Sequence, residues 1–157
     1  MKMLLCALAV LLMNSRAAMA SNSITTNQNT LLLVIGAGGE EKYAQQFQSW
    51  ANAWQRAATN LKATPILVGA GTTSTNDLEQ LKELLSAQPR EGSNLLWIVL
   101  IGHGTFDGET AKFNLRGPDF SAAQLADWLR PFDRPTVVID NSACSGPFVD
   151  ELSRPGR

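Results

Sequence analysis

Two side chains of this chain are suited to covalent chemistry, and both follow apolar runs. His103, the one histidine of the sequence, lies two residues beyond the apolar run 95–101. Cys144 lies five residues beyond a second apolar run, 136–139. A thiol within reach of an imidazole that takes its proton is the arrangement that nucleophilic catalysis needs. The spacing therefore predicts a Cys-His pair, provided that the two runs are neighbouring strands of one sheet.

Four apolar runs predict the strands that would position this pair. Runs that are apolar on both faces and bounded by glycine are typical of parallel strands inside a sheet. The stretches between them predict helices, so the order indicates an open α/β sheet with right-handed crossovers. Ligands bind such sheets beyond the carboxyl ends of the strands, where both residues lie. The predicted strands are 31–35, 65–68, 95–101 and 136–139.

The predicted helices are amphipathic. Residues 74–77 supply N-cap candidates for the second helix, and Ser121 with Gln124 forms a capping box for the third. Residues 106–118 predict a small hairpin or irregular excursion. A fresh helix start at 148–152 leaves a four-stranded sheet unfinished, so we expect a fragment that lacks its last strands. The first helix carries an aromatic stripe that we interpret as a face packed on the sheet: Tyr43, Phe47, Trp50, Trp54 and Leu61.

The first 20 residues predict a secretory signal peptide. Lys2 and the free amine are positively charged, and an apolar run over 3–13 follows. Ala18 and Ala20 supply the small residues that a signal peptidase needs. We therefore expect export, with the mature protein in the periplasm or outside the cell.

Signal cleavage would leave a single cysteine. Cleavage after Ala20 removes Cys6, so Cys144 remains alone and no internal disulfide can form. Such a cysteine is a reactive thiol, an intermolecular bridge or a buried inert residue. The polar residues 21–30 predict a linker, and residues 31–157 predict one incomplete α/β domain.

Composition excludes several classes of protein. The 157 residues are 45% hydrophobic and 17% charged, which indicates a core-forming chain. The net charge of −1, without a run of like charges, argues against a nucleic-acid partner. No apolar stretch reaches the roughly 18–20 residues of an integral membrane span. Two cysteines and one histidine cannot supply a four-ligand zinc site, and we expect neither metal nor cofactor.

The two motifs resemble those of the caspase-like cysteine peptidases, and most of all the legumain-type branch. The Gly-His-Gly around His103 matches the histidine motif, and the Ala-Cys-Ser-Gly around Cys144 is close to the cysteine motif. The interval of 41 residues suits the same branch. The resemblance implies a caspase-like αβα sandwich around a mostly parallel sheet. It also implies that Cys144 is the nucleophile, that His103 is the general base, and that the backbone N–H groups of Gly104 and Cys144 form the oxyanion hole.

The residues around the substrate pocket depart from the family. Legumain-type and metacaspase-type enzymes usually carry an acidic residue two positions before the cysteine, where this chain has Ser142. Neither the Asn preference of one branch nor the Lys/Arg preference of the other therefore carries over. The candidates for lining the substrate pocket are Ser142, Asp140, Glu40, Glu41 and Lys42.

Several functions remain open from the sequence. The first is an exported cysteine endopeptidase that cleaves peptides or proteins through a thioester intermediate. The second is a caspase-like domain that no longer cleaves and serves as a binding or scaffolding module. A serine esterase is disfavoured because no Gly-x-Ser-x-Gly elbow is present. A dinucleotide site on Gly36-Ala37-Gly38 fails because Glu41 stands where the fingerprint requires glycine or alanine.

Singly, both residues also have purely structural explanations. A lone histidine between glycines is often a satisfied structural residue, and a lone cysteine near a strand end is often a small buried apolar residue. Only their joint position at one rim of the sheet favours catalysis.

Overall fold

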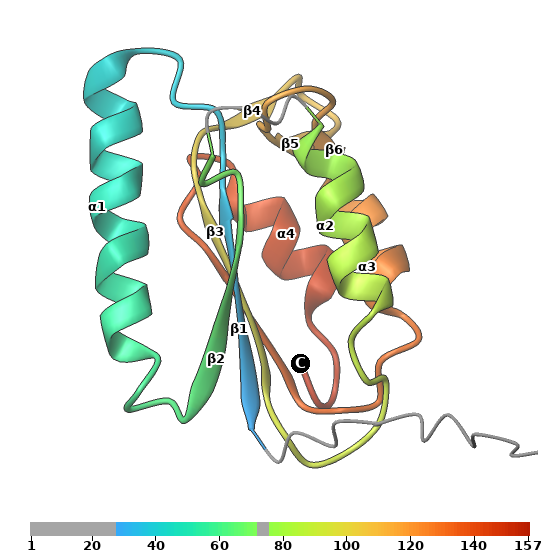
Figure 1. Ribbon diagram of the computed structural model, residues 1–157. Helices are drawn as coiled ribbons and strands as arrows, with labels where there is room; N and C mark the ends of the chain where they lie inside the picture. Colours follow the sequence, from blue (N-terminus) through green and yellow to red (C-terminus); the bar gives the residue numbers. More distant parts are fainter. Residues whose placement is uncertain (1–27, 72–75) are drawn as a thin grey trace, which may run out of the picture.

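The computed structural model describes residues 28–71 and 76–157, and its centre is a parallel sheet (Figure 1). The strand order is β2-β1-β3-β7, and all three neighbouring pairs run parallel. The four predicted strands are thereby confirmed, and β3 and β7 are direct neighbours. Their bounds are β1 Asn29–Ile35, β2 Ala63–Val68, β3 Leu96–Ile101 and β7 Thr136–Asp140.

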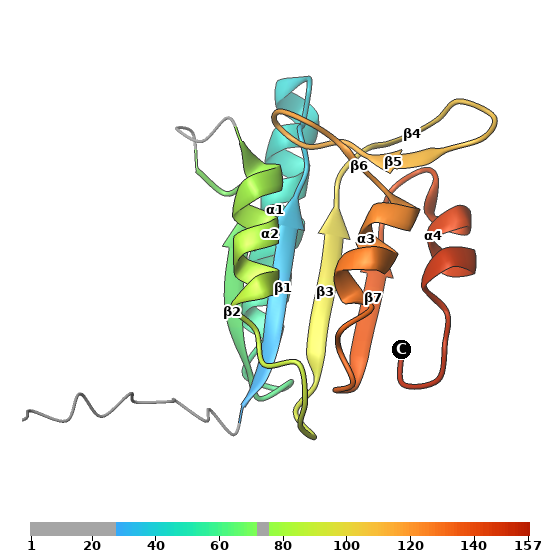
Figure 2. The same cartoon turned by 90° about the vertical axis from the view of Figure 1, so that its right-hand side faces the viewer.

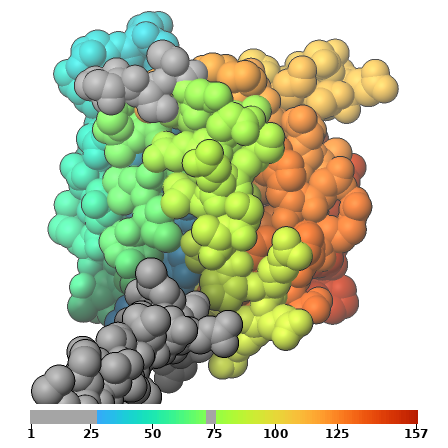
Figure 3. All heavy atoms as spheres, turned by 45° about the vertical axis from the view of Figure 1, so that its right-hand side comes forward, coloured from blue at the N-terminus to red at the C-terminus, as the bar shows by residue number. Residues whose placement is uncertain are grey.

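Helices cover the two faces of the sheet unequally, which makes a three-layered α/β domain. The helix α1, Glu41–Ala57, stands alone on one face (Figure 1). Three helices cover the other face: α2 Asp77–Ser86, α3 Ala122–Leu129 and α4 Ser145–Leu152. In the space-filling view α2 and α3 lie over neighbouring parts of this face (Figure 3).

Two apolar cores follow from this layering. The core under α1 contains Phe47 and Ala51 with the alternate side chains of β1 and β3, such as Leu33 and Val99. The core on the other face contains the opposite side chains of the same strands, together with α2, α3 and α4. Strands buried on both faces explain why the sequence shows continuous apolar runs rather than alternation.

A second, small antiparallel sheet lies at the carboxyl ends of the parallel strands (Figure 2). It has the order β4-β5-β6, with β4 Gly104–Phe106, β5 Ala111–Phe113 and β6 Phe120–Ser121. The excursion predicted for 106–118 is therefore larger than a hairpin, and its first strand begins directly after His103. This sheet brings β5 over the end of β7.

The caps of two helices agree with the sequence. The Asn76 side chain accepts the Glu79 N–H at 3.3 Å and caps α2. The Ser121–Gln124 capping box is present at α3. Asp77, in the first turn of α2, is fully buried and forms a two-pronged ion pair with Arg116 at 2.8 Å, which ties α2 to the small sheet.

Other boundaries differ from the prediction. The first strand begins at Asn29, so the predicted linker 21–30 ends earlier, and the predicted signal 1–20 lies outside the described residues. The helix α4 begins at Ser145 rather than at 148, because its glycine and proline fall in the first turn, where backbone N–H groups need no helical partner.

The aromatic stripe of α1 is only partly a buried face. Phe47 is 4% exposed, whereas Trp50 is 40% exposed. At 100° per residue, Trp50 lies about 60° from Phe47 around the helix axis, towards a part of the sheet that α1 does not cover. The helix ends at Ala57, so Leu61 lies in the turn before β2. Within the described residues no helix is long and apolar enough to cross a membrane.

Candidate functional site

His103 lies at the end of β3 on the α1 side of the sheet. Its ring meets the edge or face of two aromatic rings of α1, with centroid distances of 4.8 Å to Tyr43 and 5.0 Å to Phe47. Its Nε2 lies 3.3 Å from the carbonyl oxygen of Gly38, in the loop between β1 and α1. These three contacts fix the imidazole against the loop and the first turns of α1.

Cys144 lies beyond the end of β7 and belongs to the core on the other face. It occupies the N-cap position of α4 and is 8% exposed. Its thiol donates to the carbonyl oxygen of Lys112 in β5 at 3.4 Å. The Ser142 hydroxyl lies 3.8 Å from the same sulfur. The thiol is therefore packed beneath the small sheet.

Gly104 brings the two environments into contact. A Cβ added to this glycine would lie 2.3 Å from Cys144 Sγ and 2.9 Å from Ser142 Oγ. The thiol thus rests on the backbone of the residue that follows His103, and a side chain at 104 would displace it. The glycine is required here by the close approach of the sulfur.

The imidazole and the thiol share one rim but are not paired with each other. Among residues 28–71 and 76–157, the polar partner of the His103 ring is Gly38, and the thiol contacts Lys112 and Ser142. The structure therefore places the two predicted residues at adjacent strand ends, with their side chains engaged on opposite faces. A catalytic contact requires one of them to change its partner.

Two backbone N–H groups at this rim are available to an acceptor. Asn114 donates its N–H to the His103 carbonyl, which makes the following antiparallel pair, Gly104 and Phe113, a non-hydrogen-bonded one. The Gly104 N–H consequently points away from β5. The Cys144 N–H has no acceptor among the described residues.

The loop between β7 and Cys144 is shaped by Asp140. Its Oδ1 accepts the Ser142 N–H at 2.8 Å, while its Oδ2 is buried without a hydrogen-bond partner. Burial raises the pKa of this carboxyl above its usual value, and the contacts with Ser142 oppose that rise. Ser142 is itself buried, so both predicted pocket candidates serve the loop and the surroundings of the thiol.

The three charged candidates after the first strand lie at the start of α1. Glu40 and Lys42 form an exposed ion pair at 3.0 Å, and the Lys42 ammonium lies 4.7 Å from the centre of the Tyr43 ring. Glu41 accepts a hydrogen bond from Gln45 along the helix. Tyr43 links this group to His103, as does the Gly38 carbonyl, which also accepts the Glu40 N–H at 2.8 Å. The side chains of Glu40, Glu41 and Lys42 are solvent-exposed.

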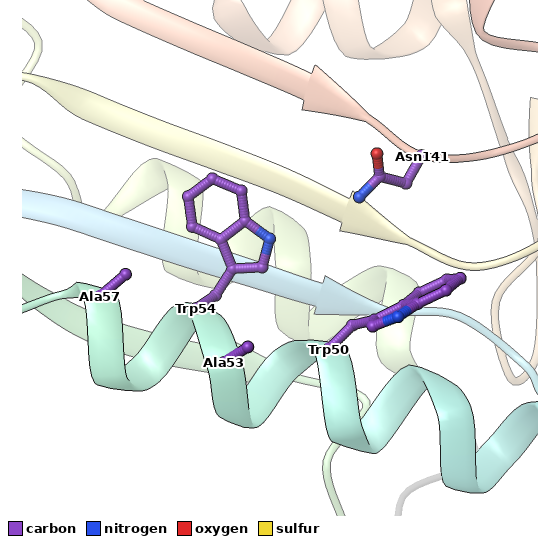
Figure 4. A pocket seen from close by; sticks show the side chains of 5 residues that line it. All are labelled: Trp50, Ala53, Trp54, Ala57 and Asn141. Carbon is purple, nitrogen blue, oxygen red and sulfur yellow. The ribbon is translucent and has the colours of Figure 1, made fainter.

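Two hollows flank β7, and sequence reasoning missed both. A cavity of about 510 Å³ lies on the α1 side of the sheet (Figure 4). A groove of about 350 Å³ lies on the other side, between β7 and α4. The signal for the first is the tryptophan pair of the aromatic stripe, which periodicity assigns wholly to the packed face. The first cavity is lined by Trp50, Ala53, Trp54, Ala57 and Asn141.

No cluster of three or more histidine, cysteine or acidic side chains within the described residues is placed to hold a metal ion. Comparison of the sequence with protein-family models and with curated proteins finds no match in either.

Proposed function

We propose that this chain is a cysteine endopeptidase of the caspase-like, legumain-type kind. Cys144 is the nucleophile, His103 the general base, and the N–H groups of Gly104 and Cys144 bind the oxyanion. The substrate is a peptide or protein, and the predicted export signal assigns the reaction to the periplasm or the extracellular space.

One observation carries this proposal: the Cys144 sulfur lies against Gly104, the residue next to His103. A structural cysteine has no need to meet the backbone that carries the one histidine of the chain. A nucleophile needs its base and its oxyanion donors at one point. The N–H of Gly104 directed away from β5 and the unbonded N–H of Cys144 supply two donors beside the sulfur.

The reaction proceeds in two halves. The thiol proton passes to His103 as the sulfur attacks the peptide carbonyl carbon, and the carbonyl oxygen becomes an anion held by the two N–H groups. The C–N bond then breaks, and His103 returns the proton to the leaving amine. Water, deprotonated by His103, attacks the resulting thioester, and the cleaved acid and the free thiol are restored.

Substrate binding must rearrange the resting contacts. The thiol proton is directed to the Lys112 carbonyl, and the imidazole Nε2 lies near the Gly38 carbonyl. Catalytic hydrogen bonds are often long or misaligned without substrate, so these geometries are compatible with a resting enzyme. For catalysis, the thiol and the imidazole would both have to turn from these partners towards a substrate carbonyl bound at Gly104.

The alternative is a caspase-like binding or scaffolding domain without catalysis. The observation that favours it is the packing of the thiol: Cys144 is buried and its S–H already has an acceptor. In that case His103 is a structural residue of the α1 core, held by two aromatic rings.

Active-site labelling separates the two functions. The full chain is treated with peptide acyloxymethyl ketones carrying Asn, Asp, Arg or Leu, and the labelled cysteine is located by peptide mass spectrometry. For a peptidase we expect labelling at Cys144 that falls at least about 100-fold in His103→Ala, the scale of general base catalysis. Cys144→Ala is the matched control and must lose the label.

The proposal fails if the folded wild type takes up no probe, or if His103→Ala labels as fast as wild type. Circular dichroism of each variant shows that a missing label is not caused by unfolding. Iodoacetamide in urea shows that the thiol is present and reduced.

A further inference from the structure

We propose that the cavity lined by Trp50, Ala53, Trp54, Ala57 and Asn141, hereafter the tryptophan pocket, receives a large uncharged side chain of the peptide substrate, aromatic by preference. This inference rests on the proposed peptidase function and assigns its substrate class. It places specificity on the α1 side of β7, away from the charged residues at the start of α1.

The walls of the tryptophan pocket are suited to a ring. Two indoles stand one helical turn apart, and the two alanines leave space beside them (Figure 4). Its volume of about 510 Å³ falls within the roughly 300–1,000 Å³ of ligand pockets. An aromatic guest can stack on, or meet the edge of, an indole, which adds to the gain from burial.

The pocket has no charge to pair with a charged guest. None of its five lining residues is ionisable at neutral pH. A charged side chain would lose hydration on entry without a partner, whereas an apolar one would gain by leaving water. The same argument disfavours Asp, Lys and Arg side chains as guests.

Two residues connect the pocket with the proposed catalytic rim. The Phe47 ring contacts the His103 ring at 5.0 Å and the Trp50 ring at 5.9 Å, so one side chain joins the base to the pocket. Asn141 comes from the loop that carries Cys144, three residues earlier. A peptide bound at the rim can therefore extend a side chain into the pocket.

Asn141 supplies the one polar group of the pocket. Its carboxamide points from the end of β7 towards α1 (Figure 4) and has no hydrogen-bond partner among the described residues. Its backbone N–H is bound to the Leu100 carbonyl, which fixes the residue in place. A free amide beside an apolar pocket can bind the peptide backbone next to the inserted side chain.

The exposure of Trp50 agrees with a guest at this site. A side chain that is 40% exposed leaves much of an indole in water, beside a second indole and an open part of the sheet. Covering this surface with an apolar guest removes it from water.

The test fills the pocket instead of emptying it. Ala53 is exposed, so Ala53→Trp adds a ring to the pocket without disturbing the core. The matched control is Asn52→Trp: Asn52 is also exposed and lies on the opposite flank of α1, where it accepts hydrogen bonds from Gln48 and Gln55. The probes are tripeptide acyloxymethyl ketones in which a phenylalanine replaces alanine at each of the three positions in turn.

At one position we expect phenylalanine to label Cys144 of wild type at least about 10-fold faster than alanine, the scale of apolar side-chain discrimination. Ala53→Trp should abolish that preference, and Asn52→Trp should keep it. Asn141→Ala should slow all the tripeptides that occupy the pocket.

Two results overturn the inference and differ in meaning. If phenylalanine gives no preference, or its preference survives Ala53→Trp, the tryptophan pocket is not the side-chain site, while labelling at Cys144 still supports the peptidase. If no probe labels Cys144 of the folded wild type, the peptidase function itself fails and the inference fails with it.

Discussion

The candidate catalytic residues on the two sides of the sheet differ in how tightly they are packed. On the α1 side, a single helix holds the His103 ring by two aromatic contacts, and an open cavity lies close by. On the other side, three helices and the small sheet enclose the Cys144 thiol, which donates a hydrogen bond to a backbone carbonyl. One rim therefore carries the candidate base under a single helix and the candidate nucleophile under three helices and the small sheet.

This difference has separate consequences for substrate binding and for the stability of the fold. The larger of the two hollows beside β7 lies on the α1 side of the sheet, and the smaller groove lies between β7 and α4. The thiol side is packed to the point that Gly104 cannot carry a Cβ. Substitution of an α1 ring should thus change the surroundings of the imidazole as well as the stability, whereas substitution beside the thiol should act through the packing of the sulfur.

The largest effect should come from removing the ring that supports the imidazole. Phe47→Ala deletes a side chain that is 4% exposed and should lower the free energy of unfolding by about 3–5 kcal/mol. Phe120→Ala deletes a fully buried ring on the other side and should lose a similar amount. Urea unfolding measures both losses.

Milder substitutions of the same two phenylalanines distinguish the two sides of the sheet by proton NMR. The chain has one histidine, so its imidazole protons give one set of signals, shifted by the rings of Tyr43 and Phe47. Phe47→Leu, which keeps an apolar side chain, should move these signals, and Phe120→Leu should leave them in place. Unchanged imidazole signals in Phe47→Leu would contradict the described support of His103.

An intermediate effect is expected where the two sides meet. Gly104→Ala forces a methyl group against Cys144 Sγ and Ser142 Oγ and should cost about 1–3 kcal/mol of stability, the range of overpacked sites. It should also raise the rate of iodoacetamide labelling at Cys144, because the displaced thiol loses its cover. Gly146→Ala is the control: a Cβ there meets nothing within 4 Å, and alanine in a helix should stabilise by about 0.5–1 kcal/mol. A Gly104→Ala protein as stable as wild type would mean that the sulfur does not rest on this backbone.

The sequence predicted the sheet well and the site only in part. Short, continuous apolar runs, three of them ending at a glycine, are typical of strands that are buried on both faces of a parallel sheet. The positions of His103 and Cys144 beyond β3 and β7 followed from those strands. Periodicity, however, does not say how much of a sheet one helix covers, so it predicts a packed position for Trp50, which is 40% exposed.

The side-chain contacts of the rim could not be predicted for a different reason. Which face a residue takes after a strand ends depends on the turn that follows, and here β4 begins at once after His103 while α4 begins at once after Cys144. The turn into β4 directs the imidazole towards α1, and the turn into α4 directs the thiol under β5. The spacing of 41 residues between His103 and Cys144 gives no information about the conformation of either turn.

The smallest effect should be a dependence on pH at the loop before the thiol. Burial raises the pKa of Asp140, so the folded carboxyl binds its proton up to a higher pH than the unfolded one, whose pKa is about 3.9. Between these two pKa values the folded state holds more protons, and stability falls as the pH rises. Asp140→Asn removes this loss and keeps an oxygen for the Ser142 N–H.

Asp140→Asn should therefore unfold at a higher temperature than wild type at pH 7, by a free energy on the order of 1 kcal/mol, and the gain should shrink as the pH falls through the window. Thermal unfolding followed from pH 7 to pH 3 measures this trend. Asp107 is the control of opposite sign, because the N–H groups of Thr110 and Glu109 lower its pKa. Its stabilising contribution is present above the unfolded pKa and is lost as the pH falls, so Asp107→Asn should be less stable than wild type at pH 7. If the unfolding temperatures of both variants shift in the same direction at pH 7, the prediction is wrong. The Asp140 carboxyl would then not be buried on the thiol side, unlike the exposed carboxyl of Asp107.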